Sequence, residues 1–389
     1  MKRVMVLGGG IGGVEAAITL RAKGYAVELV SDRPYLFVYP LAIWIPTGEK
    51  RFDEVTIPLV EIGRAHGFSV TMDRVTGIDT AAKTVTLERR GARSDFDYAV
   101  WAIGAGKMPH KGKEHVLSIC GAPEESVRVK ERLDELLARG SGTIAVGFGG
   151  NPKDSSAVRG GPAFEFLLNL HDLLKHRGVR DQYKLVFFAP MPKPGIRMGE
   201  KTVEMMDSML ASLDIEQRVG RKIVEFDEKG VVFEDGSRVD ADLTMFIAAG
   251  DGHPLVKESD LPQNEAGFIT VLPTCEVEGH PWLYAVGDAA ALEGPDWKAK
   301  QGHIAELMAR VTADDIHRKE TGKGKPGSYI DHLCILCVMD MGNGAGFVYR
   351  NDERTLFLPM PVVGHWVKKS WGRYFELTKL KKMPRIPGM

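Results

Sequence analysis

The apolar run VMVL at residues 4–7 leads directly into the glycine-rich stretch GGGIGG at residues 8–13. A strand that passes through glycines into a helix is typical of a dinucleotide-binding unit, because bare backbone N–H groups and a helix N-terminus can hold a pyrophosphate. The sequence therefore predicts an α/β fold that begins with a strand. The residues expected at the pyrophosphate are Gly8, Gly10, Ile11, Gly12 and Gly13.

A second signal lies near the other end of the chain, where the apolar run 283–286 ends in Gly287 and Asp288. It places a carboxylate at the carboxyl end of a strand, where α/β sheets bind ligands. Together the two signals indicate a large dinucleotide that touches one domain at both ends, which favours FAD. Asp288 would bind the ribityl chain, and Lys300 is either a cation beside the flavin or a solvated lysine. The other residues assigned to this cofactor are Ser31, Asp32 and Arg33 at the adenosine, and Gly104, Ala105 and Gly106 in a close backbone turn.

The composition excludes several classes of protein. The chain has 389 residues with 51 basic and 52 acidic side chains, so its net charge gives no general argument for nucleic-acid binding. We expect neither a secretory signal nor a spanning helix, which needs roughly 20 consecutive apolar residues. The four cysteines do not suggest a disulfide framework, and we assign no metal site.

Strand-like and helical stretches alternate through most of the chain, which predicts repeated βα units. A second unit starts at Thr143–Gly150, and further strands are expected at residues 184–189 and 243–249. We therefore predict two nested Rossmann-like dinucleotide-binding domains. The expected boundaries are residues 1–110 and 251–325 for the FAD-binding domain, 111–250 for the second domain, and 326–389 for a C-terminal segment with an amphipathic helix.

The second domain lacks the spacing of an NADH site. In such a site the helix starts immediately after the glycines. Here the segment Asn151–Gly160, which contains Pro152, separates the glycines at residues 147–150 from a helix that starts near Gly161. The sequence therefore predicts a degenerate NAD site.

Taken together, the motifs resemble those of the sulfide:quinone oxidoreductase and flavocytochrome c sulfide dehydrogenase group of FAD enzymes. The resemblance implies a monotopic flavoprotein with two Rossmann-like domains that oxidises sulfide or a persulfide and reduces a quinone. It also implies redox-active cysteines beside the flavin, at Cys337 and, in an accessory position, at Cys120. The matching motifs, in family order, are Gly8–Gly13, Ser31–Tyr35, Ser118–Cys120, Gly161–Glu165, Tyr284–Asp288, Lys300–Gly302 and Cys337–Gly342.

The chain departs from this group at the position of the other redox cysteine, where Arg159 stands. Without that partner, Cys337 cannot form the sulfur bridge that the resemblance implies. Cys337 would act alone as a thiolate or transient persulfide, and Arg159 would lower its pKa or bind an anionic sulfur substrate. Alternatively, Arg159 is a structural replacement in a protein without sulfide chemistry, or Cys337 pairs with Cys334 or Cys120. Glu165, near a helix start, would relay protons or simply favour the helix dipole.

Residues 362–389 contain five Lys and two Arg but one Glu. Val367, Trp371 and Phe375 recur every four residues and form an apolar stripe on a helix, and the lysines at positions 368, 379 and 382 can lie outside it. Basic charge with aromatic anchors predicts a helix in a membrane interface, on the cytoplasmic side. The alternative is a helix that covers the protein body. The residues assigned to the quinone are Phe347, Trp366 and Lys368.

The expected partners are therefore a quinone, a small sulfur substrate and a membrane surface, and a homo-oligomer is compatible with the sequence. Two other functions stay open. The related type II NADH:quinone oxidoreductases share the fold, FAD and the quinone. A divergent flavoprotein without sulfide activity could instead act by binding a membrane or a protein complex.

Overall fold

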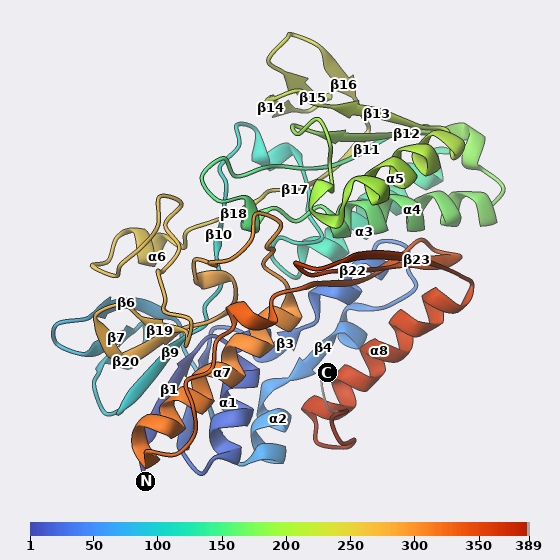
Figure 1. Ribbon diagram of the computed structural model, residues 1–389. Coiled ribbons are helices and arrows are strands. Elements are labelled where there is room, and N and C mark those ends of the chain that lie inside the picture. Colours follow the sequence, from blue (N-terminus) through green and yellow to red (C-terminus); the bar gives the residue numbers. More distant parts are fainter. Residues whose placement is uncertain (387–389) are drawn as a thin grey trace.

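The first sheet is built from two stretches of the chain, one before and one after the middle unit. A computed structural model describes residues 1–386 (Figure 1). Its largest sheet has six strands in the order β19-β20-β9-β1-β2-β5, in which every neighbouring pair except β19 with β20 is parallel. The strands are β1 (Arg3–Leu7), β2 (Ala26–Ser31), β5 (Ser69–Met72), β9 (Tyr98–Trp101), β19 (Glu276–Val277) and β20 (His280–Ala285). The predicted return of the chain to the first sheet is thus present.

Two helices pack side by side next to this sheet, α1 (Ile11–Ala22) and α7 (Gly302–Thr321) (Figure 1). A Cβ atom on Gly12 would lie 3.3 Å from Cγ2 of Val286 and 3.5 Å from the Cβ atom of Ala305 in α7, so the two helices approach closely at this glycine. Gly8 has a φ of 115°, a conformation that L-residues with side chains rarely adopt. The glycine-rich stretch is therefore required by the packing of the turn as well as by any ligand.

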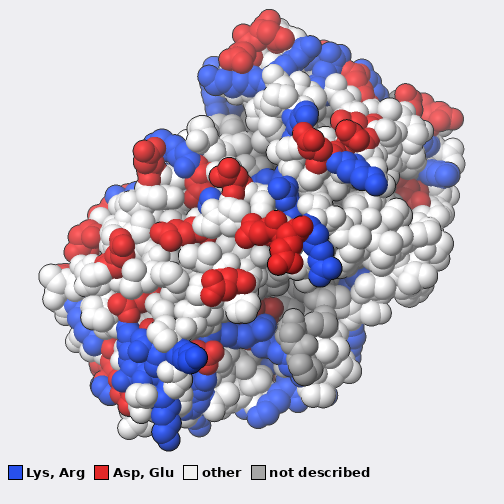
Figure 2. Space-filling model, in the orientation of Figure 1, with Lys and Arg blue, Asp and Glu red and all other residues white. Residues whose placement is uncertain are grey.

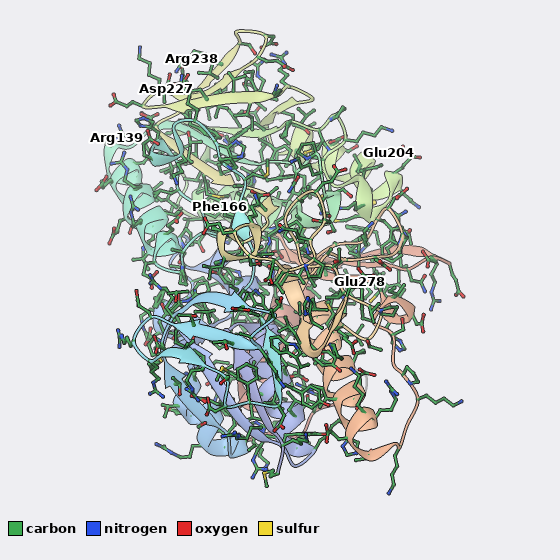
Figure 3. The ribbon with its side chains drawn as sticks, turned by 90° about the vertical axis from the view of Figure 1, so that its left-hand side faces the viewer. Arg139, Phe166, Glu204, Asp227, Arg238 and Glu278 are labelled. Carbon is green, nitrogen blue, oxygen red and sulfur yellow. The ribbon has the colours of Figure 1, made fainter. Side chains whose placement is uncertain are left out.

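The middle of the chain forms the second sheet. Four parallel strands lie in the order β13-β12-β11-β17, beside an antiparallel meander, β14-β15-β16. In Figure 3 this meander, marked by Asp227 and Arg238, lies at the end of the molecule farthest from the first sheet. The elements are α3 (Glu125–Arg139), β11 (Gly142–Phe148), α4 (Gly161–His176), β12 (Tyr183–Ala189), α5 (Glu200–Ser212), β13 (Ile215–Val219), β14 (Ile223–Asp227), β15 (Gly230–Phe233), β16 (Arg238–Asp240) and β17 (Leu243–Ile247).

Two short strands mark where the chain passes between the sheets. β10 (Gly106–Lys107) leads out of the first unit, β18 (Gly250–Asp251) leads back, and the two pair with each other. A Cβ atom on Gly106 would lie 2.8 Å from the carbonyl oxygen of Gly252, so this crossing requires glycine. The smaller elements of the first unit are β3 (Tyr35–Phe37), β4 (Thr56–Pro58), α2 (Leu59–His66), β6 (Val75–Asp79), β7 (Thr84–Leu87), β8 (Gly91–Arg93) and α6 (Pro254–Lys257).

The C-terminal segment forms a third unit against the other two. Its strands β21 (Ile335–Asp340), β22 (Gly344–Arg350) and β23 (Thr355–Pro361) make an antiparallel sheet that packs against α4. The helix α8 (Val363–Lys379) crosses this sheet (Figure 1). On the face shown in Figure 2, Lys and Arg are mixed with Asp and Glu, and the region over β22 and β23 carries few charges.

The buried face of α8 differs from the predicted one. Phe375 of the expected apolar stripe is buried, but Val367 is 40% exposed. Lys368 and Lys379, which the sequence analysis places outside the buried stripe, lie on the buried face, while Lys382 is exposed. The physical reason is charge compensation, because the protein body holds buried carboxylates that these two ammonium groups neutralise.

One of these carboxylates belongs to Glu15 of α1, which is completely buried. It pairs with Lys379 at 2.6 Å, with Arg310 at 2.9 Å, and with Arg385. Although burial favours the protonated carboxyl, the hydrogen bonds and charges of Arg385 and Lys379 hold its pKa well below the usual range. The pairs therefore stabilise the folded protein at neutral pH, and this contribution is lost as the pH falls below about 4.

Replacement of Lys379 by Met should lower the free energy of unfolding at neutral pH by about 3 kcal/mol, because it leaves Glu15 with less compensation. The difference from the parent protein should shrink below about pH 4. Urea unfolding at the two pH values measures both effects. The matched control is Arg373→Met, which removes an exposed pair with Glu376 on the same helix and should cost less than about 1 kcal/mol. Equal losses in the two variants would contradict this role of Lys379.

Candidate active site

A cavity of about 2240 Å³ lies where the two sheets and the C-terminal segment meet. Its wall includes the glycine turn after β1, the loop before α4, the start of α7, and parts of β21 and α8. Of the residues assigned from the sequence, the wall includes Gly8, Gly10, Ile11, Gly12, Ser31, Asp32, Arg33, Gly104, Ala105, Cys120, Arg159, Glu165, Gly287, Asp288, Lys300, Cys337, Phe347 and Lys368. The structure thus brings together residues that are far apart in the sequence.

Three assigned residues lie outside the cavity wall, namely Gly13, Gly106 and Trp366. The two glycines are needed for backbone packing. A Cβ atom on Gly13 would overlap the preceding turn, and Gly106 lies where the chain crosses between the sheets. Trp366 is 62% exposed on the outer side of α8. Trp371 lines the cavity instead, because it lies on a different side of the helix.

Three helix N-termini adjoin this cavity. α1 starts after Gly10, α4 after Gly160 and α7 after Gln301, and none of these residues caps its helix with a side chain. The first turns of the three helices carry no acidic residue. Free backbone N–H groups and the positive ends of three helices therefore surround one space, which favours negatively charged ligand groups.

The glycine turn fits a dinucleotide such as FAD. A Cβ atom on Gly10 or on Gly161 would meet no heavy atom within 4 Å, so both backbones are open toward the cavity. Ser31 at the end of β2 is buried, and its hydroxyl donates to the carbonyl oxygen of Arg33 at 2.8 Å. The exposed carboxylate of Asp32 remains available to a ribose hydroxyl.

Arg159 pairs with Asp288, the carboxylate assigned to the ribityl chain. Its charge also acts on Cys120, whose pKa burial raises while Lys107 and Arg159 lower it. Burial and Arg159 together lower the pKa of Lys107 to about 8. The charges that act on the Cys337 thiol are those of Glu165 and Lys368. Arg159 was expected to lower the pKa of Cys337, but the thiol whose pKa it lowers is that of Cys120.

The ammonium group of Lys300 is held by the protein. It donates to the carbonyl oxygen of Ala290 and lies 4.0 Å from the centre of the Phe268 ring. Burial lowers the pKa of Lys300 to about 7. The start of α7, rather than a free ammonium group, is therefore the constant source of positive potential at this end of the cavity.

Cys337 on β21 lies next to a buried ion pair. Glu165 of α4 pairs with Lys368 of α8 and accepts a hydrogen bond from the backbone N–H of Asp340 at 2.8 Å. Burial raises the pKa of Glu165, and Lys368 opposes this. Burial and the charge of Glu165 raise the pKa of the Cys337 thiol to about 12, and Lys368 opposes this as well. The thiol and an acid–base pair thus share one part of the cavity wall.

The cysteines are all free thiols in the part of the chain that the structure describes. Cys334 lies just before β21, with its Sγ 3.6 Å from Nε2 of His303. Cys337 is in the strand opposite Val348. The structure therefore shows neither of the alternative bridges of Cys337, to Cys334 or to Cys120.

The predicted interruption of the second glycine motif is present. β11 ends at Phe148 and α4 begins at Gly161, so the segment between them separates the glycines from the helix N-terminus. Arg197 fixes this segment by donating to the carbonyl oxygens of Ser155 and Val158. The N-terminus of α4 consequently faces the large cavity rather than a nucleotide site next to β11.

Sequence reasoning missed several residues, above all Lys107 and Trp371 in the cavity wall, and Asp340, which lies outside the wall and donates its backbone N–H to Glu165. Lys107 directly follows the assigned turn Gly104–Gly106. Asp340 is the last residue of an apolar strand, and Asp288 likewise follows an apolar run by two positions. Both signals were therefore available in the sequence. Trp371 was part of the recognised apolar stripe, and only the three-dimensional packing of α8 shows that it faces the cavity.

Comparisons with known proteins agree with this architecture. A family model described as pyridine nucleotide-disulphide oxidoreductase matches residues 2–309. The sulfide-quinone reductase of Aquifex aeolicus is 28% identical over 404 residues, which cover 96% of this chain and 90% of that protein. A type II NADH:quinone oxidoreductase of Mycobacterium tuberculosis is 25% identical over 366 residues, covering 85% of this chain and 76% of that protein.

A solved structure supports the same likeness. The X-ray structure of the sulfide:quinone oxidoreductase from Aquifex aeolicus superposes with a TM-score of 0.86 at 25% identity, covering 98% of this chain and 92% of that one. The predicted α/β fold and the resemblance stated from the motifs are thus confirmed, and the chain is an FAD-binding flavoprotein.

Replacement of Gly10 by Val should weaken FAD binding at least about tenfold, or about 1.4 kcal/mol. The new side chain fits the fold but extends into the cavity at the N-terminus of α1. The ratio of flavin to protein absorbance after purification, and FAD titration of the apoprotein, measure the effect. The control is Gly77→Val on β6, outside the cavity wall, which should keep its FAD. Full FAD content in the Gly10 variant would show that the cofactor does not approach this turn.

Proposed function

The chain belongs to the pyridine nucleotide-disulphide oxidoreductase family, and we propose that it passes electrons from a reduced sulfur species, sulfide or a persulfide, to a quinone. The observation that carries this proposal is the Cys337 thiol, which lies in the wall of the FAD cavity beside the Glu165–Lys368 pair. The similarity to a protein named sulfide-quinone reductase over nearly the whole chain supports it. FAD would supply the two-electron carrier between the two substrates.

Cys337 is the proposed sulfur-reactive residue. Because its pKa is raised to about 12, its thiol is protonated near neutral pH and must lose a proton when it reacts. The neighbouring Glu165–Lys368 pair can take or return that proton. We assign Arg159 to an anionic sulfur substrate, which its remaining N–H groups can bind, and Cys120 to an accessory role.

The sheet of the C-terminal segment offers the quinone a separate side of the cavity. Cys337 and Val338 are neighbours on β21, so their side chains point to opposite faces. Val338 is opposite Phe347 on β22, on the face that α8 covers. Phe347 and Trp371 supply aromatic surface there, and Lys368 supplies a hydrogen-bond donor. We propose that the quinone ring binds on this side.

NADH is the alternative donor, because a type II NADH:quinone oxidoreductase is also similar to this chain. The segment between β11 and α4 argues against it. This segment is fixed by Arg197 and by a hydrogen bond of 2.9 Å from the Asn151 side chain to the carbonyl oxygen of Gly250. The helix N-terminus that would hold the NADH pyrophosphate therefore lies away from the second glycine motif.

Sulfide, added without oxygen, should bleach the flavin absorbance of the holoprotein, and NADH should not. Cys337→Ser should slow this bleaching about 100-fold or more, because the hydroxyl cannot replace the sulfur nucleophile. The variant should keep the rate at which a quinone reoxidises the dithionite-reduced protein. Anaerobic stopped-flow absorbance measures both half-reactions.

Cys334→Ala is the matched control for this experiment, because it removes the thiol three residues earlier and should keep the parent rate. Bleaching by NADH and not by sulfide would favour the NADH alternative. Bleaching by neither donor, with no effect of Cys337→Ser, would favour a divergent flavoprotein whose role is binding.

An exposed apolar patch adjoins the proposed quinone side. Leu336 and Leu356 lie on either side of Tyr349 in the three-stranded sheet. They are on the same face of the sheet as α8, but the helix leaves both leucines exposed. The structure shows no helix within residues 1–386 that is long and apolar enough to span a bilayer. We propose that this patch rests on a membrane surface, from which a quinone enters the cavity. Its exposed side chains are Leu336, Leu356, Leu358, Val362, Val363, Trp366 and Val367.

The double variant Val363→Asp, Trp366→Asp should reduce binding to anionic vesicles at least about tenfold, because charges replace apolar anchors. Vesicle co-sedimentation measures it, and FAD content and far-UV circular dichroism check the fold. The control carries Asp at Val224 and Leu272, two exposed apolar residues of the other units, and should bind like the parent. Equal binding of both variants would remove the patch from the proposal. Truncation of α8 is a poorer test, because this helix carries two buried lysines.

A further inference from the structure

We propose that Glu49, His365 and Asp340 form a proton pathway from the protein surface to the buried Glu165–Lys368 pair in the cavity wall. The inference rests on the proposed function, in which a quinone is reduced in this cavity. Reduction of a quinone takes up two protons together with two electrons. The pair itself is buried, so it needs a route by which it regains each proton that it gives away.

His365 at the start of α8 lies between two carboxylates. Its Nδ1 is 2.8 Å from Oδ1 of Asp340, and its Nε2 is 2.8 Å from Oε1 of Glu49. Asp340 is completely buried, the His365 side chain is 12% exposed, and the Glu49 side chain is 27% exposed. Exposure thus increases step by step from Asp340 to Glu49. An imidazole that contacts an acceptor through each nitrogen can receive a proton on one and release it from the other.

Asp340 connects this imidazole to the cavity wall. Its backbone N–H donates to Oε1 of Glu165, and its Oδ2 accepts a hydrogen bond of 2.9 Å from the indole N–H of Trp44. The Lys368 ammonium group lies 5.9 Å from the centre of the same indole ring. Glu165 and Lys368 line the cavity, whereas Asp340, His365 and Glu49 lie outside its wall. The five side chains therefore lead from the cavity outward.

His365 lies within a cluster of charged side chains. The cluster holds three carboxylates and two ammonium groups. Anchoring of α8 alone gives no reason for a buried aspartate in this position, because a buried carboxylate costs free energy unless it is fully paired. The charged groups that face His365 or its partners from the neighbouring elements are Glu49, Asp340, Glu165, Lys368 and Lys369.

The proton balance of the pathway is simple. The quinone receives two electrons from the reduced cofactor, and an N–H bond of Lys368 breaks as an O–H bond forms on a quinone oxygen. The ion pair then regains a proton from His365 through Asp340, either by a swing of the Lys368 side chain or through one water molecule. His365 regains its proton from solvent through Glu49. Two such cycles complete the quinol.

The test follows one half-reaction of the holoprotein. The protein is reduced with dithionite, mixed with a water-soluble short-chain quinone, and followed by flavin absorbance across a range of pH. His365→Gln should slow reoxidation about tenfold, alter its pH profile and increase the solvent deuterium isotope effect. Added imidazole should restore the rate. His176→Gln is the matched control, because His176 also contacts a carboxylate, Asp172 at 3.2 Å, but on the exposed end of α4.

Reoxidation of His365→Gln at the parent rate would overturn the pathway. A slower rate with an unchanged pH profile and no rescue by imidazole would also overturn it, since these are the signs of a structural role. Should His365→Gln fail to retain FAD, Glu49→Gln at the outer end is measured in the same way, and the same two results would overturn the pathway. A parent protein that quinone does not reoxidise would refute the quinone part of the proposed function itself, independently of the variants.

Discussion

Two buried lysines of α8 hold the three parts of this protein together. Lys368 neutralises Glu165 in the second unit, and Lys379 neutralises Glu15 in the first. Each of these carboxylates would be costly to bury without its partner. The C-terminal helix is therefore bound by charge to both other units, and residues of all three parts line the cavity between them. The same contact that closes the fold also places an ammonium group in the cavity wall next to a thiol.

The elements that depend on local sequence were predictable. The strand before Gly8, the helix after it and the interruption before Gly161 follow from backbone chemistry within a few residues. The orientation of α8 was not predictable, because it is decided by carboxylates that lie 203 and 364 residues earlier in the chain. Lys368 and Lys379, which the sequence pattern places outside the apolar stripe of the helix, are buried for this reason. The partners of His365 were missed likewise, since Glu49 and Asp340 come from distant segments.

Arg159, which the sequence analysis expects at the position of a redox cysteine, has a more local effect than the sequence suggests. The guanidinium lies near Asp288, Lys107 and Cys120, where it changes the electrostatics on the side of the first unit. Cys337 keeps a raised pKa, governed by burial and by the Glu165–Lys368 pair. In the proposed reaction a single thiol therefore depends on a proton-transfer pair from two other elements. In the same proposal Arg159, although it pairs with Asp288, binds an anionic sulfur substrate through its remaining N–H groups.

An apolar electron acceptor imposes opposing demands on such a cavity. In the proposed function the quinone enters past the exposed apolar surface around Leu356 and Trp366, because a quinone partitions into a membrane rather than into water. An apolar entrance that excludes water cannot supply protons, yet reduction of the quinone consumes two of them. A chain of carboxylates and an imidazole meets this demand, since it carries protons through a packed interior without admitting solvent. In the proposed pathway, the buried Asp340 therefore transfers protons in a region where the apolar entrance excludes water.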